Sequence, residues 1–355
     1  MAAFYSLTIK AIHRETSKAV SISFDVPKDL RTTFGFVAGQ YLTLKTKIDG
    51  QEVRRDYSIS SSPSSGDLTV TIKEIEKGLF SPFANQNLKA GDVLEVAPPN
   101  GRFTFIPNSD HQNTVVAFAA GSGITPIMSI LKTVLESSNS QKFVLVYGNK
   151  TPEDTIFSQT LLELKAQYPN RLLLQHINSQ TQSDGALFGR VDRGNTNYVL
   201  KNLIDIETSS AYYLCGPEAM IQTVKEVLIE KGIDESKILF ELFTAVSTPS
   251  NDANNERIIS NNGQVETTIL VDDETEVFTM NPDHTILEAA LKQNLDVPYS
   301  CQGGVCSSCI CRITEGSAEM RQNSVLTDSE VAEGLVLSCQ AVPTSSKIFV
   351  DFDDI

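Results

Sequence analysis

Four cysteines near the carboxyl end of this 355-residue chain have a spacing that suits metal chemistry. Cys301, Cys306 and Cys309 form the pattern C-x4-C-x2-C. Cys339 follows after 29 intervening residues. Four thiolates are the usual ligand set of a 2Fe–2S cluster. The glycines at 303–304 carry no Cβ, so backbone N–H groups can come close to sulfur atoms there. The pattern therefore predicts a 2Fe–2S cluster held by these four cysteines.

A zinc site and a disulfide are the alternatives to the cluster. Structural zinc sites favour two C-x2-C pairs, and this chain has only the pair Cys306 and Cys309. Five of the six cysteines lie in the last third of the chain, which favours metal ligation over a disulfide framework. Cys311 lies beside an expected strand at 310–314. We interpret it as a buried neighbour, and as the substitute if one of the four ligands were wrong.

The net charge of −15 is concentrated at the carboxyl end. From Val265 onward there are 16 acidic and four basic residues, so this part carries −12 of the total. This charge argues against nucleic-acid binding, because phosphate neutralisation needs a basic face. The acidic end either steers the chain towards a basic partner or only keeps its surface soluble. Residues 1–10 show no signal peptide, and no apolar run could span a membrane, so a cytoplasmic protein is expected.

The first hundred residues have the pattern of an all-β domain. Short β-branched or alternating runs predict strands at 5–12, 19–26, 41–48, 67–75 and 93–97. Turn sequences rich in Gly, Asp, Ser and Pro separate these runs. Short strands at regular spacing predict a small antiparallel β-barrel.

The segment 55–60, R-D-Y-S-I-S, has residue types that suit a flavin. The Tyr57 ring can stack on the isoalloxazine, Ser58 can hydrogen-bond its reactive edge, and Arg55 can pair with a phosphate. In the segment 77–82, K-G-L-F-S-P, the start of a short helix can seat a pyrophosphate on backbone N–H groups. A half-buried tyrosine and an ordinary helix N-cap are the simpler interpretations of these two segments.

Beyond residue 107, apolar strands alternate with helical segments. This alternation predicts a parallel sheet with helices on both faces and ligands at the carboxyl ends of the strands. The turn 120–126, A-G-S-G-I-T-P, lets a pyrophosphate approach the helix expected to begin at Pro126. The turn 215–217, C-G-P, repeats the device at a second crevice, where it could bring a nicotinamide close to a flavin. Cys215 fits a small core residue equally well.

Taken in order, R-x-Y-S, G-x-x-S, G-S-G-I-T-P and C-G-P-x-x-M resemble the ferredoxin–NADP reductase superfamily over residues 1 to about 246. The cysteine loop resembles a plant-type ferredoxin over about the last ninety residues. The resemblance implies a flavin-binding β-barrel at 1–107, an NAD(P)-binding α/β domain at 108–246, a linker at 247–264 and a 2Fe–2S β-grasp domain at 265–355.

The resemblance also implies which residues do the work. It assigns flavin contacts to Arg55, Tyr57, Ser58, Ile59, Gly78 and Ser81. It assigns nicotinamide-nucleotide contacts to Gly121, Gly123, Thr125, Cys215, Gly216 and Pro217. It assigns catalysis to Tyr57, Ser58, Cys215 and Glu241. In plant-type members a terminal aromatic residue stacks on the flavin, whereas this chain continues past Phe243.

The composition of residues 244–264 is rich in Ser, Asn, Pro and Asp, which is typical of a flexible linker. Such a linker would let the last domain move between two docking positions; a connector that stays docked is the alternative. In the last domain we expect strands at 266–271 and 276–280 and a helix at 285–294. Thr327 and Glu330 form a capping-box pattern, which predicts a further helix that ends by Gly334.

These features together suggest an electron relay in one polypeptide. NADPH would reduce FAD, and electrons would pass singly through the 2Fe–2S cluster to a terminal oxygenase or another acceptor protein. The domain order and length resemble reductases of multicomponent di-iron oxygenases; ring-hydroxylating oxygenases and hybrid-cluster protein are alternative acceptors. With four histidines and no E-x-x-H pair, the chain has no di-iron site of its own. A redox-sensing binding protein is the alternative from a different class.

The choice of nucleotide depends on cations near the ribose 2′-phosphate. Lys150 follows the second strand of the expected nucleotide domain, and Ser179 is a further candidate. Many superfamily members have an arginine just after that serine, where this chain has Gln180. The resemblance favours NADPH, with NADH as the alternative, and it favours FAD over FMN, chiefly through Gly78 and Ser81.

Overall fold

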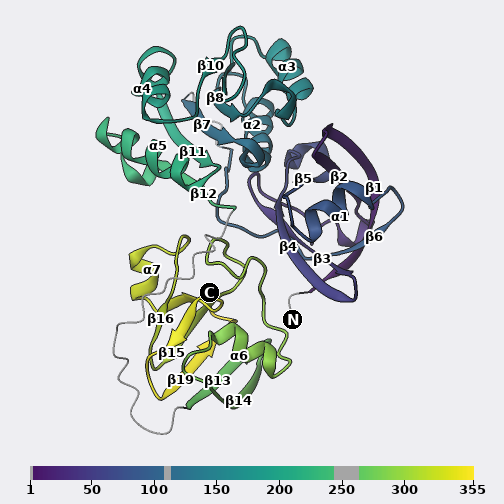
Figure 1. Ribbon diagram of the computed structural model, residues 1–355, viewed down its shortest axis with the longest axis vertical. Coiled ribbons are helices and arrows are strands. Elements are labelled where there is room, and N and C mark those ends of the chain that lie inside the picture. The colour runs from purple at the N-terminus through teal and green to yellow at the C-terminus, as the bar shows by residue number, and fades with distance from the viewer. Residues whose placement is uncertain (1–2, 108–112, 244–263) are drawn as a thin grey trace. The chain divides into compact units, whose positions relative to one another are not determined.

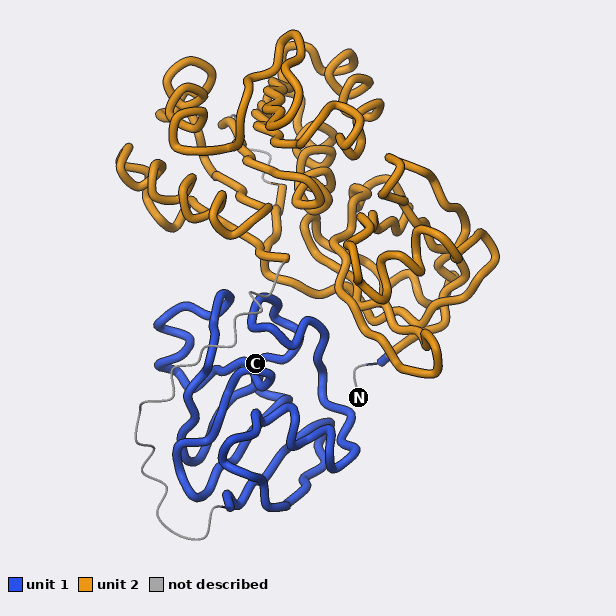
Figure 2. The backbone as a smooth tube through the Cα atoms, viewed as in Figure 1, with its two compact units in different colours: residues 1–3, 244–355 blue, residues 4–243 orange. Residues whose placement is uncertain are grey.

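The computed structural model describes residues 3–107, 113–243 and 264–355. Two compact units are present, residues 4–243 and residues 244–355 with 1–3 (Figure 2). The predicted linker, residues 247–264, lies outside the described residues except for Gln264. Within the described ranges, every helix is too short or too polar to cross a lipid bilayer.

The larger unit begins with a six-stranded antiparallel sheet (Figure 1). In hydrogen-bonding order its strands are β4 (Gln51–Ser58), β3 (Tyr41–Ile48), β6 (Val93–Val96), β1 (Tyr5–Thr16), β2 (Ala19–Asp25) and β5 (Leu68–Lys73). Alternation places Leu7 and Ile9 of β1 in the core while Ser6, Thr8 and Lys10 face solvent. A bridge between Ile59 and Val70 joins the end of β4 to β5, so hydrogen bonding also connects the two ends of this strand order. Helix α1 (Phe80–Gln86) buries Phe80 against the same core.

The second sheet of this unit is parallel, as predicted, and it has helices packed on both faces. Its order is β10 (Leu187–Phe188), β9 (Leu172–Asn178), β8 (Lys142–Asn149), β7 (Thr114–Ala120), β11 (Ser209–Cys215) and β12 (Ile238–Glu241). Helices α2 (Ile124–Ser137) and α3 (Ser158–Gln167) share a core with Val115 and Ala117 of β7. Helices α4 (Arg193–Asn202) and α5 (Glu218–Glu230) pack with the alternate residues Val116 and Phe118. Burial on both faces explains why β7 is a continuous apolar run.

The smaller unit contains a five-stranded mixed sheet with the order β14 (Glu274–Met280), β13 (Val265–Val271), β19 (Lys347–Asp351), β15 (Ile310–Glu315) and β17 (Leu335–Leu337). Strands β16 (Ala318–Met320) and β18 (Ala341–Pro343) form a separate pair. Helix α6 (Ile286–Lys292) packs on the sheet core. Helix α7 (Asp328–Ala332) has the predicted capping box, in which Thr327 and Glu330 accept from each other's backbone N–H groups.

Several elements differ from the sequence prediction. Helix α2 begins at Ile124 rather than Pro126, because a 3-10 turn over Gly121–Gly123 leads directly into it. The strand β4, which carries the R-D-Y-S segment, was not among the predicted strands, although the run at 41–48 matches β3; α4 was not predicted either. The weak apolar pattern of α4, which buries only Thr196, Val199 and Leu200, explains why it was missed.

Candidate cofactor and electron-transfer sites

Ser58, Cys215 and Glu241 come together in the larger unit where the end of β4 meets the ends of β11 and β12, a junction that we call the crevice. Ser58 is the last residue of β4, and its hydroxyl donates to a carboxylate oxygen of Glu241 at 3.3 Å. Cys215 and Glu241 end the parallel strands β11 and β12 and are register partners. Ser58 and Cys215 are 3% and 0% exposed. Three of the four residues predicted to be catalytic are therefore brought together from two different sheets.

The electrostatics of this crevice favour neutral groups. Burial raises the pKa of Glu241 to about 8, Asp56 raises it further, and the hydrogen bond from Ser58 opposes the rise. Burial and the nearby Glu241 also raise the pKa of the Cys215 thiol well above its ordinary value. At neutral pH the crevice therefore contains a protonated carboxyl and a protonated thiol side by side.

The raised pKa of Glu241 predicts a pH-dependent stability. Because the folded protein holds this proton more tightly than the unfolded chain does, the free energy of unfolding should fall as pH rises from about 4.5 to about 8, and then level off. Glu241→Gln removes the titrating group but keeps its shape. Thermal denaturation of both proteins across this window should show a steeper loss of stability in the unchanged protein. Parallel pH profiles would contradict the prediction.

Tyr57, the fourth residue predicted to be catalytic, precedes Ser58 on β4. Its ring lies 5.4 Å from that of Phe80 in α1, centroid to centroid. Burial raises the pKa of Tyr57, so the phenol stays protonated. Arg55 is exposed, and its guanidinium donates to the carbonyl of Arg54 at 2.6 Å. Ile59 is fully buried in the core, and its backbone N–H donates to the Gln40 carbonyl at 2.8 Å.

The turn before α1 brings Gly78 and Ser81 together. The Ser81 hydroxyl accepts from the backbone N–H of Ile75 at 3.0 Å. A Cβ on Gly78 would lie 2.9 Å from that hydroxyl oxygen, so the turn leaves no room for a side chain. Next to it is an open cleft of about 390 Å³, lined by Gly78, Leu79, Pro82, Phe83, Gln86, Asn87 and the β3–β4 turn from Lys47 to Asp49.

The turn over Gly121–Gly123 lies against the end of β11. A Cβ on Gly123 would lie 2.1 Å from the Cys215 carbonyl oxygen, so this approach requires glycine. The buried Tyr147 of β8 donates from its hydroxyl to the Gly121 carbonyl at 3.0 Å. Thr125 is buried and donates to the Ser122 carbonyl at 3.1 Å, so its hydroxyl serves the turn itself. The two turns that were predicted separately thus form one surface at the carboxyl ends of β7 and β11.

Lys73, which the sequence reasoning missed, reaches this surface from the antiparallel sheet. Its Nζ atom lies 3.5 Å from the position that a Cβ on Gly121 would take. Burial lowers the pKa of Lys73, and the nearby Lys150 and Lys18 lower it further while Asp154 opposes them. Lys73 therefore lies beside the Gly121–Gly123 turn, and Asp154, Lys150 and Lys18 are near enough to Lys73 to affect its pKa. Nothing in the local sequence signals this, because a lysine at the end of a strand is ordinary.

Lys150, predicted to face a 2′-phosphate, is exposed directly after β8. Its carbonyl accepts from the backbone N–H of Gln180, and the carbonyl of Asn149 accepts from Ser179. The ends of β8 and β9 thus place Lys150 beside both Ser179 and Gln180. Gly216 and Pro217 lead from β11 into α5, and a Cβ on Gly216 would meet the Ala120 backbone at 3.2 Å.

The four cysteines predicted to be ligands form two close pairs in the smaller unit. The Cys301 and Cys306 sulfur atoms lie 3.1 Å apart. The Cys309 thiol donates to Cys339, which raises the pKa of Cys309 and lowers that of Cys339. Hydrogen bonds from Cys306 and from backbone N–H groups lower the pKa of Cys301. No disulfide joins any of the six cysteines.

Two pairs of thiols fit a binuclear cluster better than a single metal ion. In a 2Fe–2S cluster with four thiolates, each iron takes two of them, whereas a zinc ion needs four donors around one point. In the described part of the chain, no three His, Cys, Asp or Glu side chains converge on one point in that way. The backbone N–H of Gly303 points at the Cys301 sulfur at 3.3 Å, as expected for the glycine-rich side of a cluster.

Two buried hydroxyls beside the cysteines also fit a 2Fe–2S cluster. Ser300 and Ser338 are 2% and 0% exposed, and neither hydroxyl has a hydrogen-bond partner in the structure. Each precedes a cysteine, one in each pair. Leaving a buried hydroxyl unpaired costs about 1–3 kcal/mol, and cluster sulfur would supply acceptors. Cys311 is instead buried in β15, where its thiol faces the Val336 carbonyl, as the interpretation of a buried neighbour requires.

Known protein families match residues in both compact units. Three family models match: an oxidoreductase FAD-binding domain over residues 6–105, an oxidoreductase NAD-binding domain over 118–226, and a 2Fe-2S iron-sulfur cluster binding domain over 269–344. One of the subunits of 1,2-phenylacetyl-CoA epoxidase from Escherichia coli is 39% identical over 354 residues, 99% of each chain. The chain belongs to the ferredoxin–NADP reductase superfamily, in the group with a fused 2Fe–2S domain.

Other members of the superfamily are similar over nearly the whole of this reductase. The ferredoxin reductase component of 3-ketosteroid-9-alpha-monooxygenase from Rhodococcus rhodochrous is 34% identical and covers 98% of this chain and 96% of that protein. The solved structure of phthalate dioxygenase reductase aligns with a TM-score of 0.61 at 22% identity and covers 98% of each chain. A type IV self-sufficient cytochrome P450 monooxygenase aligns with a TM-score of 0.70 at 18% identity, over 98% of this chain and 41% of that one. At these identities the two structures show the fold alone.

Proposed function

We propose that this reductase takes electrons from NADPH and delivers them, through FAD and a 2Fe–2S cluster, to the oxygenase of a phenylacetyl-CoA epoxidase system. The observation that carries the proposal is the crevice in which Ser58 of one sheet meets Glu241 of the other, next to Cys215. A flavin and a nicotinamide have to meet between two such sheets. When bound, a flavin accepts a hydride and releases electrons singly to a one-electron centre.

Each predicted residue has a proposed role in this scheme. Tyr57, which packs against Phe80, would hold the flavin ring, and Ser58 and Glu241 would hold protons where the flavin accepts the hydride. Arg55 and the Gly78–Ser81 turn hold the flavin phosphates. The cleft of about 390 Å³ beside Gly78 offers room for the adenosine half, which favours FAD over FMN. The cluster ligands are Cys301, Cys306, Cys309 and Cys339.

The domain boundaries that we propose are 1–107 for a closed flavin barrel, 108–246 for the nucleotide domain, 247–264 for the linker and 265–355 for a β-grasp ferredoxin domain. The bridge between Ile59 and Val70 supports closure of the barrel. The parallel pairing of β13 with β19, beside the antiparallel hairpin of β13 and β14, supports the β-grasp.

The Gly121–Gly123 turn, with Thr125, Cys215, Gly216 and Pro217, holds the nicotinamide nucleotide in this proposal. Lys73, Lys150 and Lys18 supply positive charge at its phosphates. The positive charge of Lys73 at this turn and of Lys150 after β8 favours NADPH, which has the extra 2′-phosphate, over NADH.

Replacing Lys73 by glutamine is expected to raise the KM for NADPH by about tenfold with little change in kcat, because a charged contact to a phosphate contributes about 1.5–3 kcal/mol in both ground and transition states. Lys142→Gln is the matched control, since Lys142 is an exposed lysine at the opposite end of β8. Steady-state kinetics with ferricyanide measure both constants. An unchanged KM would remove Lys73 from the nucleotide site.

The proposed function is tested by an anaerobic titration of the purified protein with NADPH and, separately, NADH, followed in the visible spectrum. Flavin and cluster absorption should both bleach, and with less NADPH than NADH. A bleached flavin with an unreduced cluster would disprove the internal relay. Absence of cluster absorption after iron and sulfide reconstitution would remove the role proposed for the four cysteines.

The acceptor is tested by adding purified oxygenase components. A phenylacetyl-CoA epoxidase should turn over with this reductase, and a ring-hydroxylating oxygenase or hybrid-cluster protein should be served poorly. Steady NADPH oxidation with cytochrome c also separates the reductase from a redox-sensing binding protein, because a sensor has no need of turnover.

A further inference from the structure

The larger unit has two lobes, one built on the antiparallel sheet and one on the parallel sheet. A buried hydroxyl in α2, which belongs to the parallel-sheet lobe, bonds directly to the antiparallel-sheet lobe. Ser129 is 0% exposed, and its hydroxyl donates to the backbone carbonyl of Ser61 at 2.6 Å. The two residues are separated by 68 positions in the chain. Ser61 follows Ser58 by three residues, so this hydrogen bond holds the backbone that emerges from the crevice.

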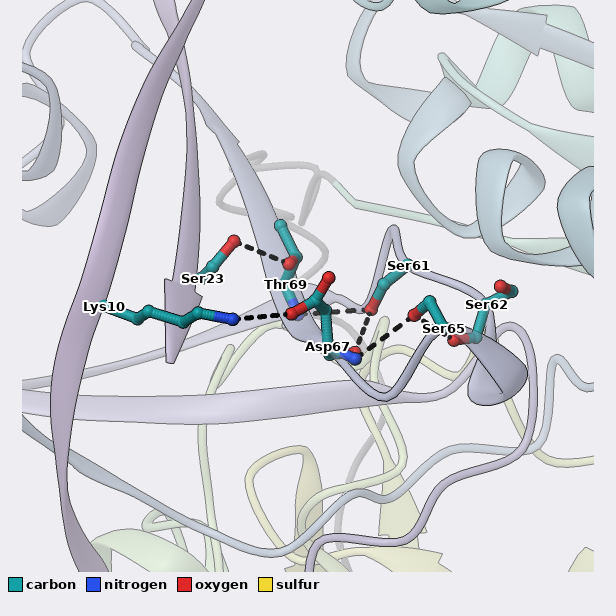
Figure 3. A network of polar contacts seen from close by, with 7 residues as sticks. All are labelled: Lys10, Ser23, Ser61, Ser62, Ser65, Asp67 and Thr69. Atoms are coloured by element: carbon teal, nitrogen blue, oxygen red, sulfur yellow. Dashed lines mark hydrogen bonds and ion pairs between the residues drawn. The ribbon is translucent and has the colours of Figure 1, made fainter. Parts of the chain in front are cut away.

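The segment that carries the Ser61 carbonyl is itself braced. The Ser61 side chain bonds within the same segment: its hydroxyl donates to the Asp67 carbonyl at 2.8 Å and accepts from the Thr69 backbone N–H at 3.2 Å (Figure 3). Lys10 binds the Asp67 carboxylate at 3.0 Å, and Ser23 bonds Thr69 at 2.8 Å. These contacts hold the loop between β4 and β5, residues 59–67. Because these contacts fix the loop, a shift of α2 is passed to Ser58 rather than absorbed.

A second hydroxyl makes the equivalent contact beside Cys215. Tyr213 is 4% exposed, and its hydroxyl donates to the backbone carbonyl of Thr104 at 3.0 Å. Its ring packs edge-on against Phe103 and Phe105, at 5.3 and 6.5 Å between centroids. Tyr213 precedes Cys215 by two residues on β11, so this contact holds the other wall of the crevice.

We propose that Ser129 and Tyr213 are positioning residues, which lock the two lobes so that Ser58 stays within hydrogen-bond reach of Glu241 and beside Cys215. This inference rests on the proposed function, since it assigns the crevice to hydride transfer. The Ser58–Glu241 hydrogen bond is already long at 3.3 Å, so a small rotation between the lobes breaks it. The hydrogen bonds of Ser129 and Tyr213 are buried and end on backbone carbonyls, so neither needs a bound ligand as a partner.

The test is a double-mutant cycle in the full-length protein carrying its flavin and cluster. Ser129→Ala and Tyr213→Phe are made alone and with Ser58→Ala, and the limiting rate of flavin reduction by NADPH is measured by anaerobic stopped flow. Each single change should lower this rate about tenfold, because small misplacements at a reacting centre are costly. The NADPH concentration at half-maximal rate should stay within about twofold. In the Ser58→Ala background the further loss should be less than about twofold, since residues that act through one another are not additive.

Two control variants separate positioning from stability. Thr133→Val removes a buried hydroxyl one turn further along α2, which bonds only to the Ser129 carbonyl of the same helix. Tyr212→Phe removes a buried phenolic hydroxyl on the opposite face of β11. Both should leave the limiting rate unchanged. Tyr213→Phe deletes no carbon atom, so it tests the proposal even if Ser129→Ala does not fold.

The outcomes are distinguishable. If NADPH reduces the flavin of the protein without substitutions, and reduces the flavin of Ser129→Ala and Tyr213→Phe at the same limiting rate, only the positioning role is overturned. Equal losses in the Ser58 and Ser58→Ala backgrounds would also overturn it, because the lock would then act elsewhere. An unchanged protein that neither nucleotide reduces would overturn the proposed function and this inference with it.

Discussion

Cys339→Ala is expected to abolish electron delivery to cytochrome c while NADPH still reduces the flavin and ferricyanide. Removing outer-shell partners of a metal alone costs about 10–100-fold, so loss of a direct ligand should lower the cytochrome c rate by at least about 100-fold. The residues that match the FAD-binding domain lie in the other compact unit, so the flavin content should be unchanged. Iron content, the visible spectrum and the two acceptor assays together measure the effect.

Cys311→Ala is the matched control for this prediction. Cys311 is fully buried, two residues from Cys309, and its burial raises the pKa of its thiol. Its thiol faces the Val336 carbonyl at 3.8 Å. Its replacement should therefore leave a small cavity and lower stability, with the iron content and the cytochrome c rate preserved. Loss of iron in Cys311→Ala, with a normal cluster in Cys339→Ala, would reverse the ligand assignment.

Gly123→Ala should slow flavin reduction by NADPH by about 100-fold or more. A Cβ at this position would lie 2.1 Å from the Cys215 carbonyl oxygen and 2.8 Å from the Gly216 nitrogen, so one of the two turns has to move. The backbone φ of Gly123 is −60°, so the effect comes from space and not from backbone strain. A misplacement of about 1 Å can cost about 100-fold in rate.

The matched control for Gly123→Ala is Gly194→Ala. Gly194 lies in α4, and a Cβ there would meet nothing closer than the Asp192 carboxylate at 3.4 Å. This change should stabilise the helix by about 0.5–1 kcal/mol and leave the rate unchanged. Flavin content and the cluster spectrum verify that Gly123→Ala remains folded. A folded variant with a normal rate would show that the two turns do not form the nucleotide site.

The elements that the sequence predicted well are those whose signal is local. The capping box at Thr327 and Glu330 depends on residues three apart, and the structure has it. The apolar run at 114–119 predicted a strand of a sheet with helices on both faces, and β7 buries alternate residues in two cores. Helix α4 was missed because its apolar face is narrow, and β4 was missed because its charged residues conceal the strand alternation.

The candidate site divides in the same way. Spacing along the chain was enough to select the four cysteines and to order the flavin and nucleotide segments, because cluster loops and phosphate turns are built from neighbouring residues. It also predicted Cys311 as a buried neighbour of the expected strand at 310–314, with a role as substitute ligand left open. The pairing of β15 with β17 turns that thiol into the core, opposite Val336.

The sequence by itself determined the chemistry of this protein: which thiolates, rings and glycine turns it has, and in what order. Only the tertiary structure decided that Ser58 reaches Glu241 across 183 residues, that Lys73 reaches the Gly121 turn, and that Ser129 and Tyr213 lock the lobes around them. The physical reason is that such contacts depend on how two sheets pack. Packing is set by the shape of whole cores, and no local pattern of residues records it.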